Sequence, residues 1–202
     1  MFEALSQKRF LAKPVVLSNE VEWFDNCRAR GLIDILFLMP DKSRVVCCFR
    51  DGLVTYFTAR WEFVKEIKKW DITYKEKLSE EYSFARPKFD NNENALMDIL
   101  NKIENFARLI GFENFGDIFA EAKSYLKENI ISCDESIIKL PENRKRLFLA
   151  ASKAYVFGSM GSWNDLPQCV SHEKGLDMEY KTLSTELLKQ IKNTLLFSVN
   201  EW

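Results

Sequence analysis

Residues 157–166 read Phe-Gly-Ser-Met-Gly-Ser-Trp-Asn-Asp-Leu, and they separate two long helical patterns. Gly158 and Gly161 permit a positive φ angle, and the polar side chains that follow can bond to their own backbone. Trp163 is a large apolar ring in a segment whose local propensity favours a loop. The stretch is therefore predicted to be a packed corner between helices, with Met160 and Trp163 in the core, or alternatively a binding loop.

Helical patterns lie on both sides of this stretch, because apolar residues recur there at spacings of three and four. Gly111 stands where a left-handed cap residue belongs, and Pro141 suits a first helical turn. Four helices are predicted, over residues 92–110, from about Asn114, from Pro141 to about Phe157, and over residues 177–200. Since short links favour antiparallel neighbours, an antiparallel helical bundle is predicted for the C-terminal part.

Strand-like apolar runs dominate the N-terminal part: Leu32–Met39, Arg44–Arg50 and Leu53–Ala59. Asp51-Gly52 predicts a two-residue hairpin turn, which pairs Arg50 with Leu53 and so sets the register of the two strands. Both faces of this sheet are apolar, so helices are expected to cover at least one of them. One helix is predicted before the sheet, from Ser18 or Asn19 to Gly31.

Residues 60–77 allow two interpretations. Phe63, Ile67, Trp70 and Tyr74 recur at spacings of four, three and four, which favours an amphipathic helix, whereas a further strand could begin at Asp71.

The polar residues 78–92 mark the predicted domain boundary. The fold class is therefore α+β: residues 1–88 form a small antiparallel sheet with flanking helices, and residues 89–202 form the helical bundle. The two parts are expected to pack as one compact unit.

Composition excludes several classes of function. With 29 basic and 30 acidic residues, the chain has no excess positive charge for nucleic acid. The five cysteines include no Cys-x-x-Cys motif, so no zinc site and no cofactor are predicted, and free thiols suit the cytoplasm. No apolar run is long enough for a signal peptide or a membrane span, so no membrane contact is expected.

His172 is the single histidine, so nucleophilic catalysis through an imidazole must use it. Cys169 and Asp165 lie nearby in a polar segment, and a hydrolase or transferase using these three residues is kept as an alternative. The same residues lack a convincing fourth ligand for a metal ion. Paired carboxylates elsewhere lie in polar surroundings that do not raise a pKa for acid catalysis. No catalytic residue is therefore predicted.

The segment Ala154–Asp165, followed by a long terminal helix, resembles a pattern in a family of small, uncharacterised bacterial proteins. The resemblance covers roughly residues 92–202 and implies no activity and no catalytic residue. In type, the chain is also similar to the immunity proteins of bacterial toxin systems, which are small, cytosolic and rich in aromatic residues.

These likenesses favour a non-enzymatic protein that binds a protein partner, such as a toxin domain that it neutralises by covering the active site. Aromatic anchors would supply the central contacts and acidic residues would attract a basic partner. The predicted contacts are Met160, Trp163, Asn164, Asp165 and His172, with the polar loop 166–175. A structural subunit that self-associates through the C-terminal helices is the third alternative.

Overall fold

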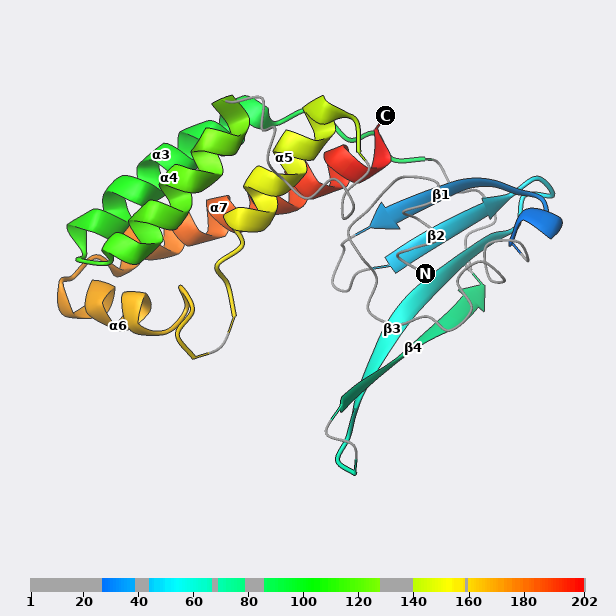
Figure 1. Cartoon of the computed structure of the whole chain (residues 1–202), viewed down its shortest axis with the longest axis horizontal. Helices are drawn as coiled ribbons and strands as arrows, with labels where there is room; N and C mark the ends of the chain where they lie inside the picture. The colour runs from blue at the N-terminus through cyan, green and yellow to red at the C-terminus, as the bar shows by residue number, and fades with distance from the viewer. Residues whose placement is uncertain are drawn as a thin grey trace. The chain divides into compact units, whose positions relative to one another are not determined.

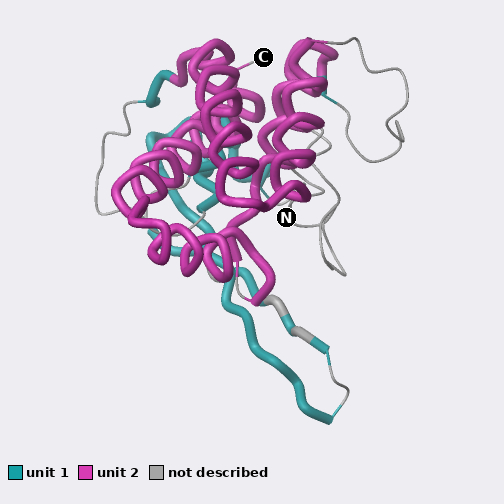
Figure 2. The backbone as a smooth tube through the Cα atoms, turned by 90° about the vertical axis from the view of Figure 1, so that its left-hand side faces the viewer, with its two compact units in different colours: residues 1–88, 134–140 teal, residues 89–133, 141–202 magenta. Residues whose placement is uncertain are grey.

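The computed structural model describes residues 27–38, 44–66, 69–78, 86–127, 140–158 and 160–201. The chain divides into two compact units, residues 1–88 with 134–140 and residues 89–133 with 141–202 (Figure 2). The first holds a small antiparallel sheet and the second holds helices (Figure 1), which confirms the predicted α+β class. We call them the sheet unit and the helical unit.

The sheet has the strand order β1-β2-β3-β4, with antiparallel neighbours throughout. The strands are β1 (Leu32–Leu38), β2 (Arg44–Phe49), β3 (Val54–Val64) and β4 (Lys69–Leu78). The first three were predicted from their apolar runs. Residues 27–29 are helical and stop at Gly31, whose φ angle is 82°. The predicted start of that helix, at Ser18 or Asn19, lies outside the described residues.

The hairpin between β2 and β3 forms where Asp51-Gly52 predicts it, but its predicted register is wrong by one residue. Cys48 pairs with Val54 and Arg44 with Thr58. The loop has three residues, because the Phe49 N–H donates to the Leu53 carbonyl at 2.9 Å. The Gly52 N–H donates to the Phe49 carbonyl at 3.1 Å, and the Gly52 φ angle is 86°. A turn followed by a left-handed glycine lengthens the loop by one residue and shifts every pair.

The amphipathic helix predicted over residues 60–77 is wrong. β3 continues to Val64, and β4 begins at Lys69 and extends past Asp71, where the alternative strand was placed. Strand pairing explains the outcome, because β3 and β4 stay in one register from Thr55↔Leu78 to Val64↔Lys69. Aromatic and β-branched residues fit such a paired ribbon as well as they fit a helical stripe.

Five helices follow in the described part of the helical unit: α3 (Glu93–Leu109), α4 (Glu113–Lys127), α5 (Glu142–Lys153), α6 (Leu166–Glu173) and α7 (Asp177–Asn200). The predicted cap at Gly111 is confirmed, since its φ angle is 91° and its N–H donates to the Arg108 carbonyl. The predicted third helix ends at Lys153 instead of Phe157. α6 falls where a polar loop was predicted.

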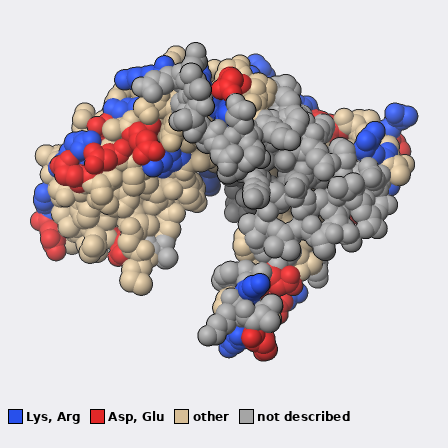
Figure 3. All heavy atoms as spheres, in the orientation of Figure 1, with Lys and Arg blue, Asp and Glu red and all other residues tan. Residues whose placement is uncertain are grey.

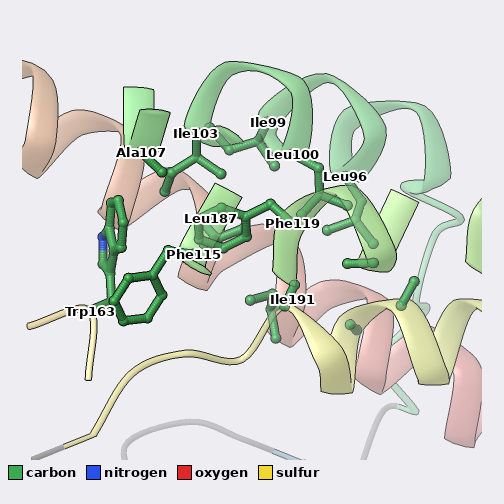
Figure 4. Packing of buried hydrophobic residues seen from close by; sticks show 14 of the residues in the cluster. Leu96, Ile99, Leu100, Ile103, Ala107, Phe115, Phe119, Trp163, Leu187 and Ile191 are labelled. Atoms are coloured by element: carbon green, nitrogen blue, oxygen red, sulfur yellow. The ribbon is translucent and has the colours of Figure 1, made fainter. Parts of the chain in front are cut away.

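The core of the helical unit lies between α3, α4, α5 and α7 (Figure 4). Its fully buried members include Leu96 and Leu100 of α3, Phe119 of α4 and Leu187 of α7. Burying one side chain of this size stabilises a fold by roughly 1.5–3 kcal/mol. The helical periodicity that predicts these helices is thus the pattern of their buried faces.

A buried polar cluster fixes α7 against the start of α3. The Asn92 amide donates to the Gln190 side-chain oxygen at 2.6 Å, and the Thr194 hydroxyl donates to the Asn92 side-chain oxygen at 2.9 Å. Since buried polar groups cost free energy unless they are paired, these bonds favour one alignment of α7 on α3. None of the helices in the described residues is long and apolar enough to cross a membrane.

Candidate functional site

The segment between α5 and α6, residues 154–165, is a closed loop that we call the Trp163 loop. The Trp163 N–H donates to the Val156 carbonyl at 3.0 Å, and this bond joins the two ends of the loop. At its tip, the Gly161 N–H donates to the Asp165 carboxylate at 2.8 Å, and Gly161 has a φ angle of 80°. Glycine adopts this left-handed conformation without a steric penalty, so the sequence here permits the turn.

Trp163 anchors the loop in the helical unit, where its side chain is fully buried. The indole packs edge-on against Phe115 and Phe119 of α4, with ring centroids 5.2 and 5.5 Å away. It stacks on Tyr180 of α7 at 5.7 Å. Figure 4 shows Trp163 at the end of the core beside Phe115. Aromatic pairs of this kind stabilise a fold beyond the area they bury, so the loop has a fixed position.

Two hydrogen bonds to α7 hold the same tryptophan. The indole N–H donates to the Ser184 hydroxyl at 2.8 Å, and the Tyr180 hydroxyl donates to the Trp163 carbonyl at 2.8 Å. Burial raises the pKa of Tyr180, because the phenolate is poorly solvated there. The neutral hydroxyl is therefore the form that keeps the loop attached to α7.

The favoured interpretation of this stretch as a packed corner is confirmed for Trp163 and wrong for Met160. The ring of Trp163 has no exposed surface, so its predicted direct contact with a partner is corrected to an anchoring role. The side chain of Met160 is 93% exposed. The physical reason is the turn at Gly161, which directs Trp163 inward while Met160 remains at the outer tip.

The other predicted contacts lie at the surface. Asn164 is exposed, and its N–H donates to the Ser162 hydroxyl at 3.3 Å. Asp165 is half-buried and uses its carboxylate to close the loop tip. His172 lies on α6 with its side chain 80% exposed, and its Nδ1 is 2.9 Å from the Asp177 carboxylate. The Trp163 loop and α6 thus place these residues in one continuous stretch of chain.

The turn from α6 to α7 brings His172 and Asp177 together. The Gly175 N–H donates to the His172 carbonyl, and the Leu176 N–H donates to the Ser171 carbonyl. This pattern ends a helix with a left-handed glycine and directs the chain sharply back. Asp177 begins α7 and meets the last turn of α6 as a result.

Two members of the proposed set Cys169, His172 and Asp165 bond to groups outside that set. The imidazole of His172 bonds to Asp177, whereas the Asp165 carboxylate bonds to the Gly161 N–H. Within the described residues, no group of three or more histidine, cysteine or acidic side chains is placed to hold a metal ion.

No family model, curated protein or solved structure matches this chain. The likeness to small bacterial proteins and to immunity proteins therefore stays a prediction. What the site can do has to be judged from its own residues.

Two large apolar residues at the ends of the loop are also exposed. Tyr155 and Leu166 each keep more than half of their surface exposed at the two ends of the loop. Residues 154–164 contain no charged side chain. In Figure 3, the part of the helical unit below the charged residues of α3 and α4 is mostly uncharged. Sequence analysis missed Tyr155, because the helical pattern from Pro141 to about Phe157 places it on a buried face, and it included Leu166 only as part of the polar loop 166–175.

Proposed function

We propose that this protein is a non-enzymatic binding protein that contacts a protein partner through the exposed side of the Trp163 loop. One observation carries the proposal: Trp163 is sealed in an aromatic cluster while Met160, three residues earlier, is 93% exposed. A loop that is already fixed loses little conformational entropy on binding. Methionine adapts its flexible side chain to a partner's surface, and exposed apolar residues that cluster together mark interaction sites.

The charges around the loop favour a basic partner. The sequence from Asp165 to Glu179 contains four acidic residues and one lysine. Asp177 and Glu179 are exposed on the first turn of α7, next to the α6–α7 turn. Complementary charge speeds association and selects the partner, while the apolar residues supply the central contacts.

A toxin domain with a basic active-site surface fits this chemistry, so neutralisation by covering that surface is the proposed mechanism. Enzymes that act on nucleic acids are examples of such a partner, since their substrates carry negative charge. The binding protein needs no catalytic residue for this task. Its contribution is a fixed apolar loop with acidic side chains beside it.

The experiment compares Met160→Asp with the wild-type protein as bait in a lysate of the native cell. Leu78→Asp is the matched control, because Leu78 is an equally apolar, exposed residue in the sheet unit. We expect the wild-type protein and the control to retain one stoichiometric protein, and Met160→Asp to lose it. The retained protein, tested alone, is expected to have an activity that the wild-type chain suppresses at a one-to-one ratio.

Recovery of no stoichiometric partner contradicts the proposal. Equal recovery by all three baits contradicts the proposed site, and a partner whose activity is unchanged in the complex contradicts neutralisation.

A further inference from the structure

Two buried cysteines of the sheet unit are in contact with each other. Cys27 begins the short helical turn before β1, which Figure 1 shows in blue, and Cys47 lies within β2. Their exposed fractions are 1% and 0%, and both are free thiols. The two thiols share a hydrogen bond. Sequence analysis did not pair them, because no local motif joins a helical turn to the second strand of a sheet.

The position of Arg30 supports this contact independently. Its guanidinium lies 4.5 Å from the centre of the Phe49 ring and donates to the Glu76 carboxylate at 2.8 Å. Cys27 and Arg30 are three residues apart in the turn, so their side chains lie on one side of it. Cys47 and Phe49 are two residues apart in β2, so they share a face of the sheet. The turn therefore lies over this face, and its cysteine meets the cysteine of β2.

The adjacent Cys48 does not take part in this contact. Side chains alternate along a strand, so Cys48 is directed to the face of the sheet opposite to that of Cys47. It packs there against a buried cluster formed by Leu36, Val46 and Val54. Among the cysteines in the described part of the sheet unit, Cys27 and Cys47 are thus the pair that shares a face.

The surroundings of the pair make Cys27 the more reactive thiol. The hydrogen bond from Cys47 lowers the pKa of Cys27, and the Arg30 guanidinium lowers it further against the opposing effect of burial. The same hydrogen bond, together with burial, raises the pKa of Cys47. Because the thiolate is the nucleophile in disulfide exchange, Cys27 reacts first and Cys47 keeps its proton until then.

Burial protects both thiols as long as the turn stays on the sheet. On its outer side, the turn is held by the ion pair of Arg30 with Glu76, whose side chains are 39% and 33% exposed. An ion pair that is partly solvated contributes little to stability. Local opening of such a segment also costs less free energy than unfolding the whole unit. Opening of the turn is therefore the route by which a small oxidant reaches the thiols.

We propose that Cys27 and Cys47 form a reversible disulfide when the turn opens to a small disulfide oxidant such as glutathione disulfide. The Cys27 thiolate attacks one sulfur of the oxidant, so a mixed disulfide forms and one glutathione thiolate leaves. Cys47 then loses its proton and attacks the Cys27 sulfur, which releases the second glutathione thiolate. The protein gives up two electrons and two protons, and glutathione disulfide takes them up to become two glutathione thiols.

The disulfide ties the turn to β2. A cross-link of this kind restricts the unfolded chain, so the oxidised sheet unit is expected to be more stable than the reduced one. Urea unfolding with and without dithiothreitol measures this difference, and the oxidised chain is expected to have the higher midpoint. The modification site lies in the sheet unit and uses no residue of the Trp163 loop, so it is independent of the proposed binding function.

The test incubates the folded full chain with glutathione disulfide at neutral pH, blocks the remaining thiols and maps the peptides by mass spectrometry without reduction. We expect a link between Cys27 and Cys47 that dithiothreitol removes. Cys48→Ser is expected to keep the link, and this variant separates the two adjacent cysteines, which lie in one tryptic peptide. Cys47→Ser is expected to lose the link and to leave Cys27 as a mixed disulfide with glutathione. Cys169→Ser, on the exposed surface of α6, is the control and is expected to match the wild type.

A second variant tests the route of access. Glu76→Gln removes the partner of Arg30 and a negative charge that disfavours the Cys27 thiolate, so the link is expected to form on the order of threefold faster. Glu173→Gln, which removes an exposed carboxylate on α6, is the matched control and is expected to react at the wild-type rate.

The absence of the link at every concentration of glutathione disulfide overturns the proposal. So does a link from Cys27 to any other cysteine, or a link that forms only in urea. A Glu76→Gln chain that reacts at the wild-type rate overturns the route through the turn. Circular dichroism checks the fold of each variant, and the maps of the wild type and of Cys48→Ser decide the pairing even if Cys47→Ser does not fold.

Discussion

Trp163 lies in a loop and Trp61 lies in a strand, and the surroundings of the two rings are opposite. Trp163 is fully buried, since rings from α3, α4 and α7 surround it. Trp61 is 57% exposed on β3, where it pairs with Ile72 of β4. The burial of an aromatic ring therefore depends on which elements, distant in the sequence, pack against it. One tryptophan therefore fixes a loop, and the other keeps more than half of its surface exposed.

The most sensitive test of this contrast is Trp163→Ala against Trp61→Ala. Removing the indole leaves a cavity among Phe115, Phe119 and Tyr180 and removes the bond to Ser184, so we expect the free energy of unfolding of the helical unit to fall by about 3–5 kcal/mol. Trp61→Ala is expected to change it by less than about 0.5 kcal/mol, because that ring is exposed. Urea unfolding followed by circular dichroism measures both. Equal effects of the two substitutions would contradict the burial of Trp163 among these rings.

Tyr180→Phe tests the hydrogen bond that holds the loop to α7. The buried Trp163 carbonyl loses its donor, and we expect a loss of about 1–2 kcal/mol at neutral pH. Tyr155→Phe is the matched control, since its hydroxyl lies on an exposed residue and its removal is expected to leave stability unchanged. A Tyr180→Phe protein as stable as the wild type would contradict the bond.

The raised pKa of Tyr180 also predicts a pH dependence. As the pH rises above about 10, the usual pKa of tyrosine, the unfolded chain loses this proton before the folded chain does. Proton loss then favours the unfolded state. The contribution of Tyr180 to stability is therefore full below about pH 10, and it is lost as the pH rises through the raised pKa of the folded state. Unfolding measured from pH 8 to 11 is expected to show a steeper loss for the wild type than for Tyr180→Phe. Parallel curves would contradict this assignment.

Gly161→Ala tests the turn that separates Met160 from Trp163. No atom lies within 4 Å of an added Cβ, so the cost comes from the positive φ angle alone and is expected to be about 1 kcal/mol. Gly158→Ala is the comparison, because Gly158 is not among the glycines with a positive φ angle. Thermal unfolding of both variants measures the difference, and a larger loss for Gly158→Ala would contradict the turn geometry.

Met160→Ser is expected to have the smallest effect, a change in unfolding free energy within about 0.5 kcal/mol, because the side chain is almost fully exposed. The proposed role of Met160 is to bind the protein partner, not to stabilise the fold. A clear destabilisation, measured by urea unfolding, would show that Met160 packs in the core after all.

Local patterns predicted the helices better than the strands. The stripe over residues 92–110 and the pattern over residues 177–200 became α3 and α7, with bounds within a residue of the prediction. Their hydrogen bonds lie within each helix, so the period of the apolar residues is enough to reveal them. The helix predicted over residues 60–77 was wrong. The aromatic spacing there suits a helix, but the pairing of β3 with β4 decides the structure.

The position of the loop between α5 and α6 was predicted, but the orientation of its side chains was not. Glycines and polar residues correctly marked a loop at residues 157–165, and Asp177 was missed as the partner of His172 because a helix end and a glycine turn lie between them. Which side of the loop faces solvent depends on rings that α4 and α7 supply. No local pattern contains that information.

By itself, the sequence determined the α+β division, the helical stripes and the turns at glycine residues, because each depends on residues that are close together in the chain. Tertiary structure decided that Trp163 turns inward and Met160 outward, and that β3 and β4 pair along one long ribbon. The physical reason is that burial and strand pairing are interactions between distant segments, whose free energy outweighs local preference.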